Sequence, residues 1–407
     1  MSDAVVVSAT RSPIGRAMKG SLVDVRPDDL AATVVGAALA KVPGMTAADL
    51  DDLVLGCAEP SGEQGTNLAR VVAVLLGHDG LPGTTVNRFC ASSVQTTRMA
   101  FHAIKAGEGH AFVSAGVECV SRYRGVVGAE LFGEDAMNPR FEAARRRSGE
   151  TARSGARWHD PRENGELPDI YIAMGQTAEN VAKDRGISRE RQDEWGVTSQ
   201  NRAEAAIAAG YVDAEITPVT TPDGTLVTRD DGPRAGVTLA KVSQLQPVFR
   251  ADGTVTAGNC CSLNDGAAAL VVVSSDFASA HGLTPLARVV STGVSALSPE
   301  LMGMGPVEAS RQALERAGLT MADIDLVEIN EAFASQVLAS ADDLGVDLDR
   351  LNVHGGAIAY GHPFGATGAR ITTTLLNALQ VRDGRFGLET MCVGGGQGMA
   401  VVYERLS

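Results

Sequence analysis

One cysteine of the chain stands where a β-like stretch gives way to a helical pattern. Cys90 follows "TTVNRF" and precedes "ASSVQTTRMAFHAI". A thiol at a helix N-terminus lies near unpaired backbone N–H groups, which lower its pKa and favour the thiolate. We therefore expect Cys90 to be a nucleophile, although a small buried hydrophobe is the usual reading of a single cysteine.

A histidine that is suited to accept a thiol proton lies in a glycine-rich turn. His362 is part of "GGAIAYGHPFGATGAR", residues 355–370. Imidazole exchanges protons near neutral pH, which makes it a general base for a thiol. The surrounding glycines indicate backbone packed close to a ligand, and they form no phosphate loop because no GK[ST] follows. A purely structural histidine is the alternative.

Two further segments have residues that fit the same chemistry. Asn330 begins "NEAFASQ" at a predicted strand end, where an amide can orient a water or donate a hydrogen bond. Glu331 beside it is a candidate helix cap. Cys392 begins "CVGGGQG", whose backbone N–H groups can face an oxyanion, unless the glycines only form a bend between strands.

The elements that must position these residues occur twice along the chain. "TAADLDDLVLG" (46–56) resembles "TMADIDLVEIN" (320–330), and "CASSVQTTRMAFHAI" (90–104) has the pattern of "GATGARITTTLLNAL" (365–379). Because both matches occur at nearly the same separation, we expect two homologous halves of alternating strands and helices. Such alternation predicts mainly parallel sheets, and two such halves with shared helices would form a layered α/β/α/β/α sandwich.

A different kind of segment separates the halves. Residues 122–165 lose periodicity and become polar, and helical patterns return over 189–210. We therefore predict an N-terminal half from 1–121 plus 245–283, an inserted loop domain at 122–244 and a C-terminal half at 284–407. The insert is dense in arginines, which indicate a solvated surface, a lid or an anionic-ligand rim: Arg140, Arg145, Arg146, Arg147, Arg153, Arg157 and Arg162.

Composition excludes several classes of protein. The 407 residues have a formal net charge of −14, which argues against nucleic acid as a main partner. No apolar run of membrane-spanning length and no secretory signal are recognisable. The six cysteines form no CxxC pair, so we expect no zinc site and reduced thiols in the cytoplasm. They are Cys57, Cys90, Cys119, Cys260, Cys261 and Cys392.

Together, the segments around Cys90, NEAF, GHP and CxGGG closely resemble the thiolase family, over essentially the whole chain. The resemblance implies the five-layered thiolase fold with duplicated α/β halves, and thiolytic cleavage of 3-ketoacyl-CoA. It implies that His362 deprotonates Cys90, which forms an acyl-enzyme, and that Cys392 protonates the released enolate. It further implies no metal and no permanently bound cofactor, with CoA and acyl-CoA as substrates.

The resemblance also assigns binding positions. It implies one oxyanion hole from the backbone N–H groups of Cys90 and Gly394, and another from His362 with a water held by Asn330. Residues implied to bind substrate or CoA are Arg234, Ala257, Gly258, Cys261, Met174, Met302 and Phe333. The chain departs from the family at Cys261, where many members have Ser, and at His354, where Asn is common. A structural turn residue is the favoured reading of His354.

Family features also bear on the subtype. Biosynthetic acetoacetyl-CoA thiolases typically have His before "MG" in the loop domain, where this chain has Ala173. We therefore expect a degradative 3-ketoacyl-CoA thiolase of β-oxidation, with the biosynthetic enzyme and a non-catalytic lipid carrier as alternatives. The family also implies a homodimer or homotetramer, and a complex with a hydratase/dehydrogenase partner is a further expectation.

Overall fold

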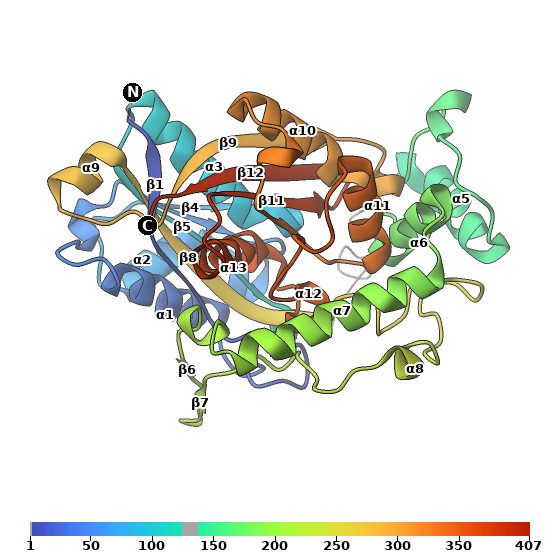
Figure 1. The fold of residues 1–407 in the computed structure, drawn as a ribbon, viewed down its shortest axis with the longest axis horizontal. Helices are drawn as coiled ribbons and strands as arrows, with labels where there is room; N and C mark the ends of the chain where they lie inside the picture. The colour runs from blue at the N-terminus through green and yellow to red at the C-terminus, as the bar shows by residue number, and fades with distance from the viewer. Residues whose placement is uncertain (1, 124–136) are drawn as a thin grey trace.

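The computed structural model describes residues 2–123 and 137–407 (Figure 1). Its centre is a ten-stranded sheet with the order β10-β11-β12-β9-β1-β8-β5-β3-β4, to which the short β2 adds beside β8. The first-half strands are β1 (Ala4–Arg11), β2 (Gly15–Arg16), β3 (Asp52–Gly56), β4 (Gly83–Val86), β5 (Ala111–Cys119) and β8 (Asn264–Ser274). The second-half strands are β9 (Ala287–Ala296), β10 (Leu326–Ile329), β11 (Phe386–Val393) and β12 (Gln397–Arg405).

The two predicted halves are visible in the strand order. Residues of β1 and β8 pair over most of their length, and β9 pairs with β12 in the same way. In the sheet, the halves meet where Val5 and Val6 of β1 pair with Arg288 and Ala287 of β9. The five-layered α/β/α/β/α architecture predicted from the sequence is therefore built from two sheets that meet along one short ladder.

The prediction of mainly parallel sheets is wrong. The β3–β4, β3–β5 and β10–β11 pairs are parallel, whereas β1–β8, β5–β8, β9–β12 and β11–β12 are antiparallel. The turn at 394–396 is too short for the crossover that parallel neighbours need, so it forces β11 and β12 to run in opposite directions.

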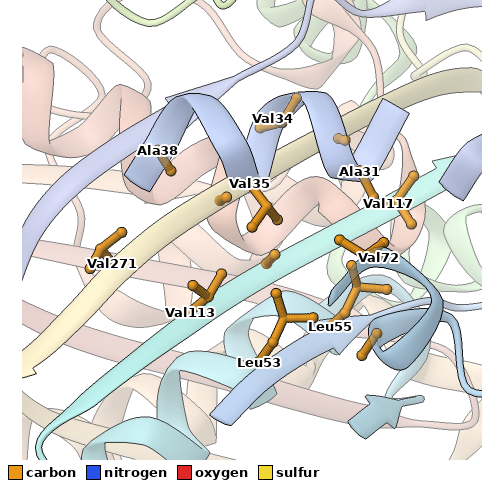
Figure 2. Packing of buried hydrophobic residues seen from close by; sticks show 14 of the residues in the cluster. Ala31, Val34, Val35, Ala38, Leu53, Leu55, Val72, Val113, Val117 and Val271 are labelled. Carbon is orange, nitrogen blue, oxygen red and sulfur yellow. The ribbon is translucent and has the colours of Figure 1, made fainter. Parts of the chain in front are cut away.

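Helices form the other three layers. On the first half, α1 (Pro27–Ala40) and α2 (Leu68–Leu75) cover the outer face of the sheet. Figure 2 shows Val34 and Val35 of α1 and Val72 of α2 packed over Leu53 and Leu55 of β3. Each such fully buried side chain contributes roughly 1.5–3 kcal/mol. This layer anchors the strands whose ends lead to Cys90.

The central layer consists of α3 (Ser92–Ala106) and α13 (Thr367–Val381). Val94 and Ile104 of α3 and Leu375 of α13 pack in one core with Leu270 of β8 and Met391 of β11. On the second half, α10 (Gly305–Ala317) and α11 (Ala334–Leu344) form the remaining layer. The helices that follow Cys90 and His362 thus lie side by side between the two sheets.

The described part of 122–244 adds no strand to the ten-stranded sheet. It forms α5 (Glu142–Ser154), α6 (Met174–Arg185), α7 (Arg189–Ala208), the β6–β7 ribbon (Val219–Thr220 and Leu226–Val227) and α8 (Leu239–Val242). Figure 1 shows α5 and α6 at one end of the molecule and α7 along its side, where α7 packs against α11 and α12 (Ala357–Tyr360). The expected loss of regular structure over 122–165 is wrong where α5 forms, and part of that segment, 124–136, lies outside the described residues. The predicted domain boundaries stay predictions.

Within the described ranges, no helix combines the length and apolar character needed to cross a bilayer.

Candidate active site

Cys90 occupies a tight turn before the central helix α3. It lies in the 3-10 segment Phe89–Ala91, whose first residue has a left-handed backbone with φ of 46°. Ser92 ties this turn from both sides, because its Oγ accepts from the N–H of Arg88 at 2.9 Å and donates to the carbonyl of Phe89 at 2.7 Å. The local fold thus presents the thiol at a fixed point between strand and helix.

The expected lowering of the Cys90 pKa is wrong. Burial raises the pKa of this thiol to about 12, against the opposing effect of the backbone N–H groups of Gly394 and of Cys90 itself. Desolvation therefore outweighs the hydrogen bonds at the helix start. Consequently the resting thiol is neutral, and reaction requires a base to remove its proton.

His362 has the tautomer that such a base needs. Its Nδ1 lies 2.6 Å from Thr367 Oγ1, and that hydroxyl donates to the carbonyl of Pro363 at 3.0 Å. Because the hydroxyl proton is already used, Nδ1 must be the donor and Nε2 is the unprotonated nitrogen. Burial and the charge of Arg370 lower the His362 pKa to about 3, so the ring is neutral.

Asn330 lies directly beside this nitrogen. Its Nδ2 is 3.3 Å from His362 Nε2, and its backbone N–H donates to Thr390 of β11 at 3.0 Å. The Oδ1 of Asn330 is buried and has no hydrogen-bond partner within 2–123 and 137–407. The histidine and the asparagine therefore form one polar pair, with an acceptor atom left over.

Cys392 lies at the end of β11, near Cys90. Burial raises its pKa well above the ordinary value, and the charge of Cys90 raises it further. The pKa of Cys261 is raised in the same way, by burial and then by Cys260, Cys90 and Cys392. These mutual effects require the sulfurs to be close together.

The histidine segment packs against the same region. The 3-10 turn Phe364–Ala366 contacts the Cys90 turn, and the N–H of Ala369 donates to Ser93 Oγ at 2.9 Å. A Cβ on Gly368 would lie only 2.5 Å from the backbone nitrogen of Val94, so α13 and α3 approach as closely as their backbones allow. The four segments that the sequence singled out converge at one place.

Three of the predicted binding residues line an apolar cluster around Cys392. Met302 and Phe333 are buried in it, Met174 packs against its edge, and Phe249 meets the Phe333 ring edge-on at 6.0 Å. Cys261 joins this wall, since its N–H donates to the carbonyl of Ala332 at 3.1 Å. Such a lining suits an acyl group next to a thiol.

The remaining predicted binding residues lie on the surface, outside the apolar cluster around Cys392. Arg234 is exposed, and its backbone N–H donates to Gln200 of α7 at 2.9 Å. Ala257 is also exposed, and Gly258 packs closely on Val242 of α8. These positions lie on the surface beside α7 and α8 and are not part of the buried cluster.

The cap interpretation of Glu331 is wrong. The helix α11 begins at Ala334, and Glu331 instead accepts from Trp195 at 3.1 Å and Ser199 at 2.7 Å, both on α7. It also accepts from Asn352 and Ile358. This carboxylate therefore fastens α7 to the segments on either side of the histidine–asparagine pair. His354 packs its ring against Tyr211 at 5.1 Å, as expected for a structural turn residue.

Sequence reasoning missed Glu118, which ends β5. Its buried carboxylate accepts from the backbone N–H groups of Ala58 and Gly365 at 2.8 Å each. It also accepts from Gln64 at 2.8 Å and from the hydroxyl of Tyr123 at 2.5 Å. A glutamate inside the apolar strand "AFVSAGVECV" was the available signal, because a buried charge needs partners.

The arginines of 140–162 do not all point to solvent. Arg147 pairs with Glu166 at 3.0 Å and with buried Glu300 at 3.3 Å. Glu300 in turn accepts from Trp158 at 2.6 Å. Arg146 is exposed. The segment is thus partly fixed to the 3-10 segment Pro299–Met304, which contains Met302.

Comparison with known proteins agrees with this site. Two family models match the chain: "Thiolase, N-terminal domain" over residues 4–276 and "Thiolase, C-terminal domain" over 283–405. The beta-ketoadipyl-CoA thiolase of Acinetobacter baylyi is 41% identical over 100% of both chains. The acetyl-CoA acetyltransferase of Escherichia coli is 43% identical over 100% of both. The 3-ketoacyl-CoA thiolase of Bacillus subtilis is 40% identical over 99% of this chain and 100% of that one.

A solved structure shares the fold. The crystal structure of the Bacillus anthracis acetyl-CoA acetyltransferase superposes with a TM-score of 0.86 at 36% identity, covering 100% of this chain and 99% of that one. The family models cover both halves, and the relatives match along their full length. The chain therefore belongs to the thiolase family, and it is an acyltransferase.

Proposed function

We propose that this enzyme cleaves a 3-ketoacyl-CoA with free CoA, giving acetyl-CoA and a shortened acyl-CoA. The observation that supports this most is the contact between the turn that holds Cys90 and the turn that follows His362, a neutral imidazole whose unprotonated Nε2 can accept a proton. A thiol and a base of this kind perform nucleophilic catalysis through a covalent acyl-enzyme.

In the first half-reaction, His362 Nε2 takes the Cys90 proton and the sulfur attacks the 3-keto carbon. The bond between C2 and C3 breaks, which leaves a thioester on Cys90 and the enolate of acetyl-CoA. Cys392 donates its proton to C2 of that enolate. Its raised pKa suits this role, because a thiol that stays protonated is available as an acid.

In the second half-reaction, the thiol of free CoA attacks the Cys90 thioester. Cys392, now a thiolate, takes the proton from the incoming thiol, and the shortened acyl-CoA leaves. As the bond between the Cys90 sulfur and the acyl carbon breaks, the proton that His362 took in the first half-reaction returns to that sulfur. Both groups regain their starting protonation, so the reaction is ping-pong and reversible.

Two oxyanions need stabilisation along this path. The N–H groups of Cys90 and Gly394, which lower the pKa of the Cys90 thiol, would hold the oxygen on the attacked carbon. The enolate oxygen would be held by His362, which carries the proton at that stage, and by a water on Asn330. The unpartnered Oδ1 of Asn330 supports this, since it is an acceptor to which such a water can donate.

The binding residues have two parts in this proposal. Met174, Met302 and Phe333 would contact the substrate near Cys392, and Cys261 with Ala257 and Gly258 would border the pantetheine arm. Arg234, exposed beside α7, would contact the CoA nucleotide. The enzyme needs no metal or redox cofactor for these steps.

We place the enzyme in degradative metabolism, such as β-oxidation. Ala173, at the position where biosynthetic members typically have His, supports cleavage of chains longer than acetoacetyl-CoA. The runner-up is condensation of two acetyl-CoA molecules, because a relative at 43% identity has the name acetyl-CoA acetyltransferase. The family resemblance supports a homodimer or homotetramer and a complex with a hydratase/dehydrogenase partner. The six free cysteines support a cytoplasmic location.

Mass spectrometry tests the chemistry directly. After mixing with a 3-ketoacyl-CoA, we expect an acyl adduct on Cys90, and none after Cys90→Ala. Cys119→Ala is the matched control, because Cys119 is a buried free thiol on β5. Its adduct should equal that of the unmodified protein. Absence of any adduct would overturn the proposal, and faster turnover of acetoacetyl-CoA than of longer substrates would favour the runner-up.

A further inference from the structure

Two apolar side chains remain exposed beside the glycine turn after Cys392. Phe89 and Ile170 are each 37% exposed. A Cβ on Gly395 would lie 3.4 Å from Ile170 Cδ1 and 3.8 Å from Phe89 Cε2, and one on Gly394 would lie 3.2 Å from Phe89 Cγ. The two side chains thus flank one turn. We call Phe89, Gly394, Gly395 and Ile170 the acyl strip.

Both side chains are held at this surface by the backbone around them. Phe89 has a left-handed φ of 46°, which a non-glycine residue rarely adopts, and its N–H donates to Asn87 Oδ1 at 2.7 Å. Ile170 follows Asp169, whose N–H donates to buried Glu300 at 2.8 Å. Neither residue is free to turn into the core, so the exposed apolar surface is a fixed feature.

The strip begins at the nucleophile. Phe89 is the residue before Cys90, and the backbone N–H of Gly394 is close enough to the Cys90 thiol to lower its pKa. An acyl chain on that sulfur, extending away from the oxygen held by Gly394, would pass next to Gly395. The strip is therefore the adjacent apolar surface on which such a chain can lie.

We propose that the acyl strip binds the chain of the 3-ketoacyl substrate beyond C3, and that it selects apolar chains over chains that end in a carboxylate. This inference rests on the proposed function and names its substrate class. The proposed substrate class differs from the beta-ketoadipyl-CoA for which one relative is named.

The charge near the strip supports an apolar chain. The neighbouring cation, Arg88, donates from Nε to Gln95 at 3.0 Å and from Nη1 to Gln397 at 3.0 Å. Two of its nitrogens are therefore already hydrogen-bonded to amide oxygens. A carboxylate against Phe89 and Ile170 would lose hydration without gaining a full ion pair.

The test is a substrate profile of kcat/KM with acetoacetyl-CoA, 3-ketooctanoyl-CoA and 3-oxoadipyl-CoA. We expect the unmodified enzyme to prefer 3-ketooctanoyl-CoA to each of the others by about tenfold or more, since even one methylene changes kcat/KM by roughly 10-fold or more. Ile170→Ala should lower kcat/KM for 3-ketooctanoyl-CoA by about tenfold and leave acetoacetyl-CoA nearly unchanged. Phe89→Leu should act in the same direction.

A matched control and two contrary outcomes complete the design. Ile207, on α7, is also 37% exposed, so Ile207→Ala should change none of the three values. Equal loss on all substrates in Ile170→Ala would overturn the strip. A preference for 3-oxoadipyl-CoA that disappears in Arg88→Gln would overturn it as well. In either case an acyl adduct on Cys90 would show that the proposed thiolysis itself stands, whereas a missing adduct would remove both.

Discussion

The backbone N–H of Gly365 donates to the Glu118 carboxylate at 2.8 Å, although 247 positions separate the two residues. Glu118 ends β5 of the first half, and Gly365 lies between His362 and its hydrogen-bond partner Thr367 in the second. The same oxygen accepts from Ala58, so one carboxylate joins both halves at the site. Its negative charge also raises the pKa of Cys90.

Glu118→Gln should therefore disturb both position and charge. The amide NH₂ must face either the Ala58 and Gly365 N–H groups or the Gln64 amide donor, so hydrogen bonds are lost in each orientation. We expect the free energy of unfolding to fall by about 1–3 kcal/mol and kcat to fall at least tenfold. The pH midpoint of Cys90 alkylation by iodoacetamide should move down, because a nearby negative charge is removed. Exposed Glu108→Gln is the control. An unchanged alkylation midpoint would contradict the electrostatic role.

Local sequence signals predicted the site residues better than their environment. Cys90, Asn330, His362 and Cys392 stand at strand ends or glycine turns, and each is recognisable from its own short segment. The five-layered fold followed from repeated segments, because homologous halves repeat their hydrophobic pattern.

The properties that the sequence did not predict depend on contacts between distant segments. The Cys90 pKa is set by burial between α3 and α13, which no local pattern reveals. Glu118 and Glu331 receive their hydrogen bonds from several separate segments. The strand directions depend on the connections. The short turn at 394–396 makes β11 and β12 antiparallel, and β8, which follows the insert, pairs antiparallel with β1 and β5.

His362 should make the enzyme less stable in acid. Its pKa is about 3 in the folded protein and ordinarily about 6.5, so between these values only the unfolded chain takes the proton. Unfolding therefore becomes easier as pH falls below 6.5, by roughly 1.4 kcal/mol per unit from this group, and the effect is absent above that pH. Urea unfolding at pH 4.5, 5.5 and 7 measures the slope.

Two variants isolate this effect. His362→Asn should flatten the slope by about one proton, whereas His281→Gln, at an exposed histidine, should keep it. If His362→Asn retained the full slope, the neutral state of His362 would be refuted. The kcat profile of the unmodified enzyme should likewise show no acidic limb near pH 6.5.

Substitution of Cys90 and of Cys392 should impair different steps of the reaction. Cys90→Ala should abolish turnover and acylation. Cys392→Ala should still allow some acylation of Cys90 by a simple thioester donor, because only the proton transfers to the enolate and from CoA are lost. Mass spectrometry of the adduct and a condensation assay measure the two steps. Equal loss of both steps in Cys392→Ala would contradict separate roles.

Arg147 connects the arginine-rich segment to the wall of the acyl site. It donates to Glu166, to the carbonyl of Leu167 at 2.7 Å and to buried Glu300. The segment was expected to be a solvated surface, a lid or an anionic-ligand rim, and the contacts of Arg147 instead fix it to the rest of the protein.

Arg147→Met should therefore loosen the segment without removing a catalytic group. We expect the local opening free energy of α5 amides to fall by about 1–2 kcal/mol, because charged hydrogen bonds to a buried carboxylate are lost. Hydrogen exchange followed by mass spectrometry measures this over 142–170. Arg146→Met is the matched control, since Arg146 is exposed on the same helix, and it should leave exchange unchanged. Equal exchange in both variants would show that the Arg147 contacts add no stability.

A raised KM for CoA in Arg146→Met would instead support the anionic-ligand surface. Because Glu300 also holds Asp169 beside Ile170, Arg147→Met should weaken 3-ketooctanoyl-CoA turnover more than acetoacetyl-CoA turnover.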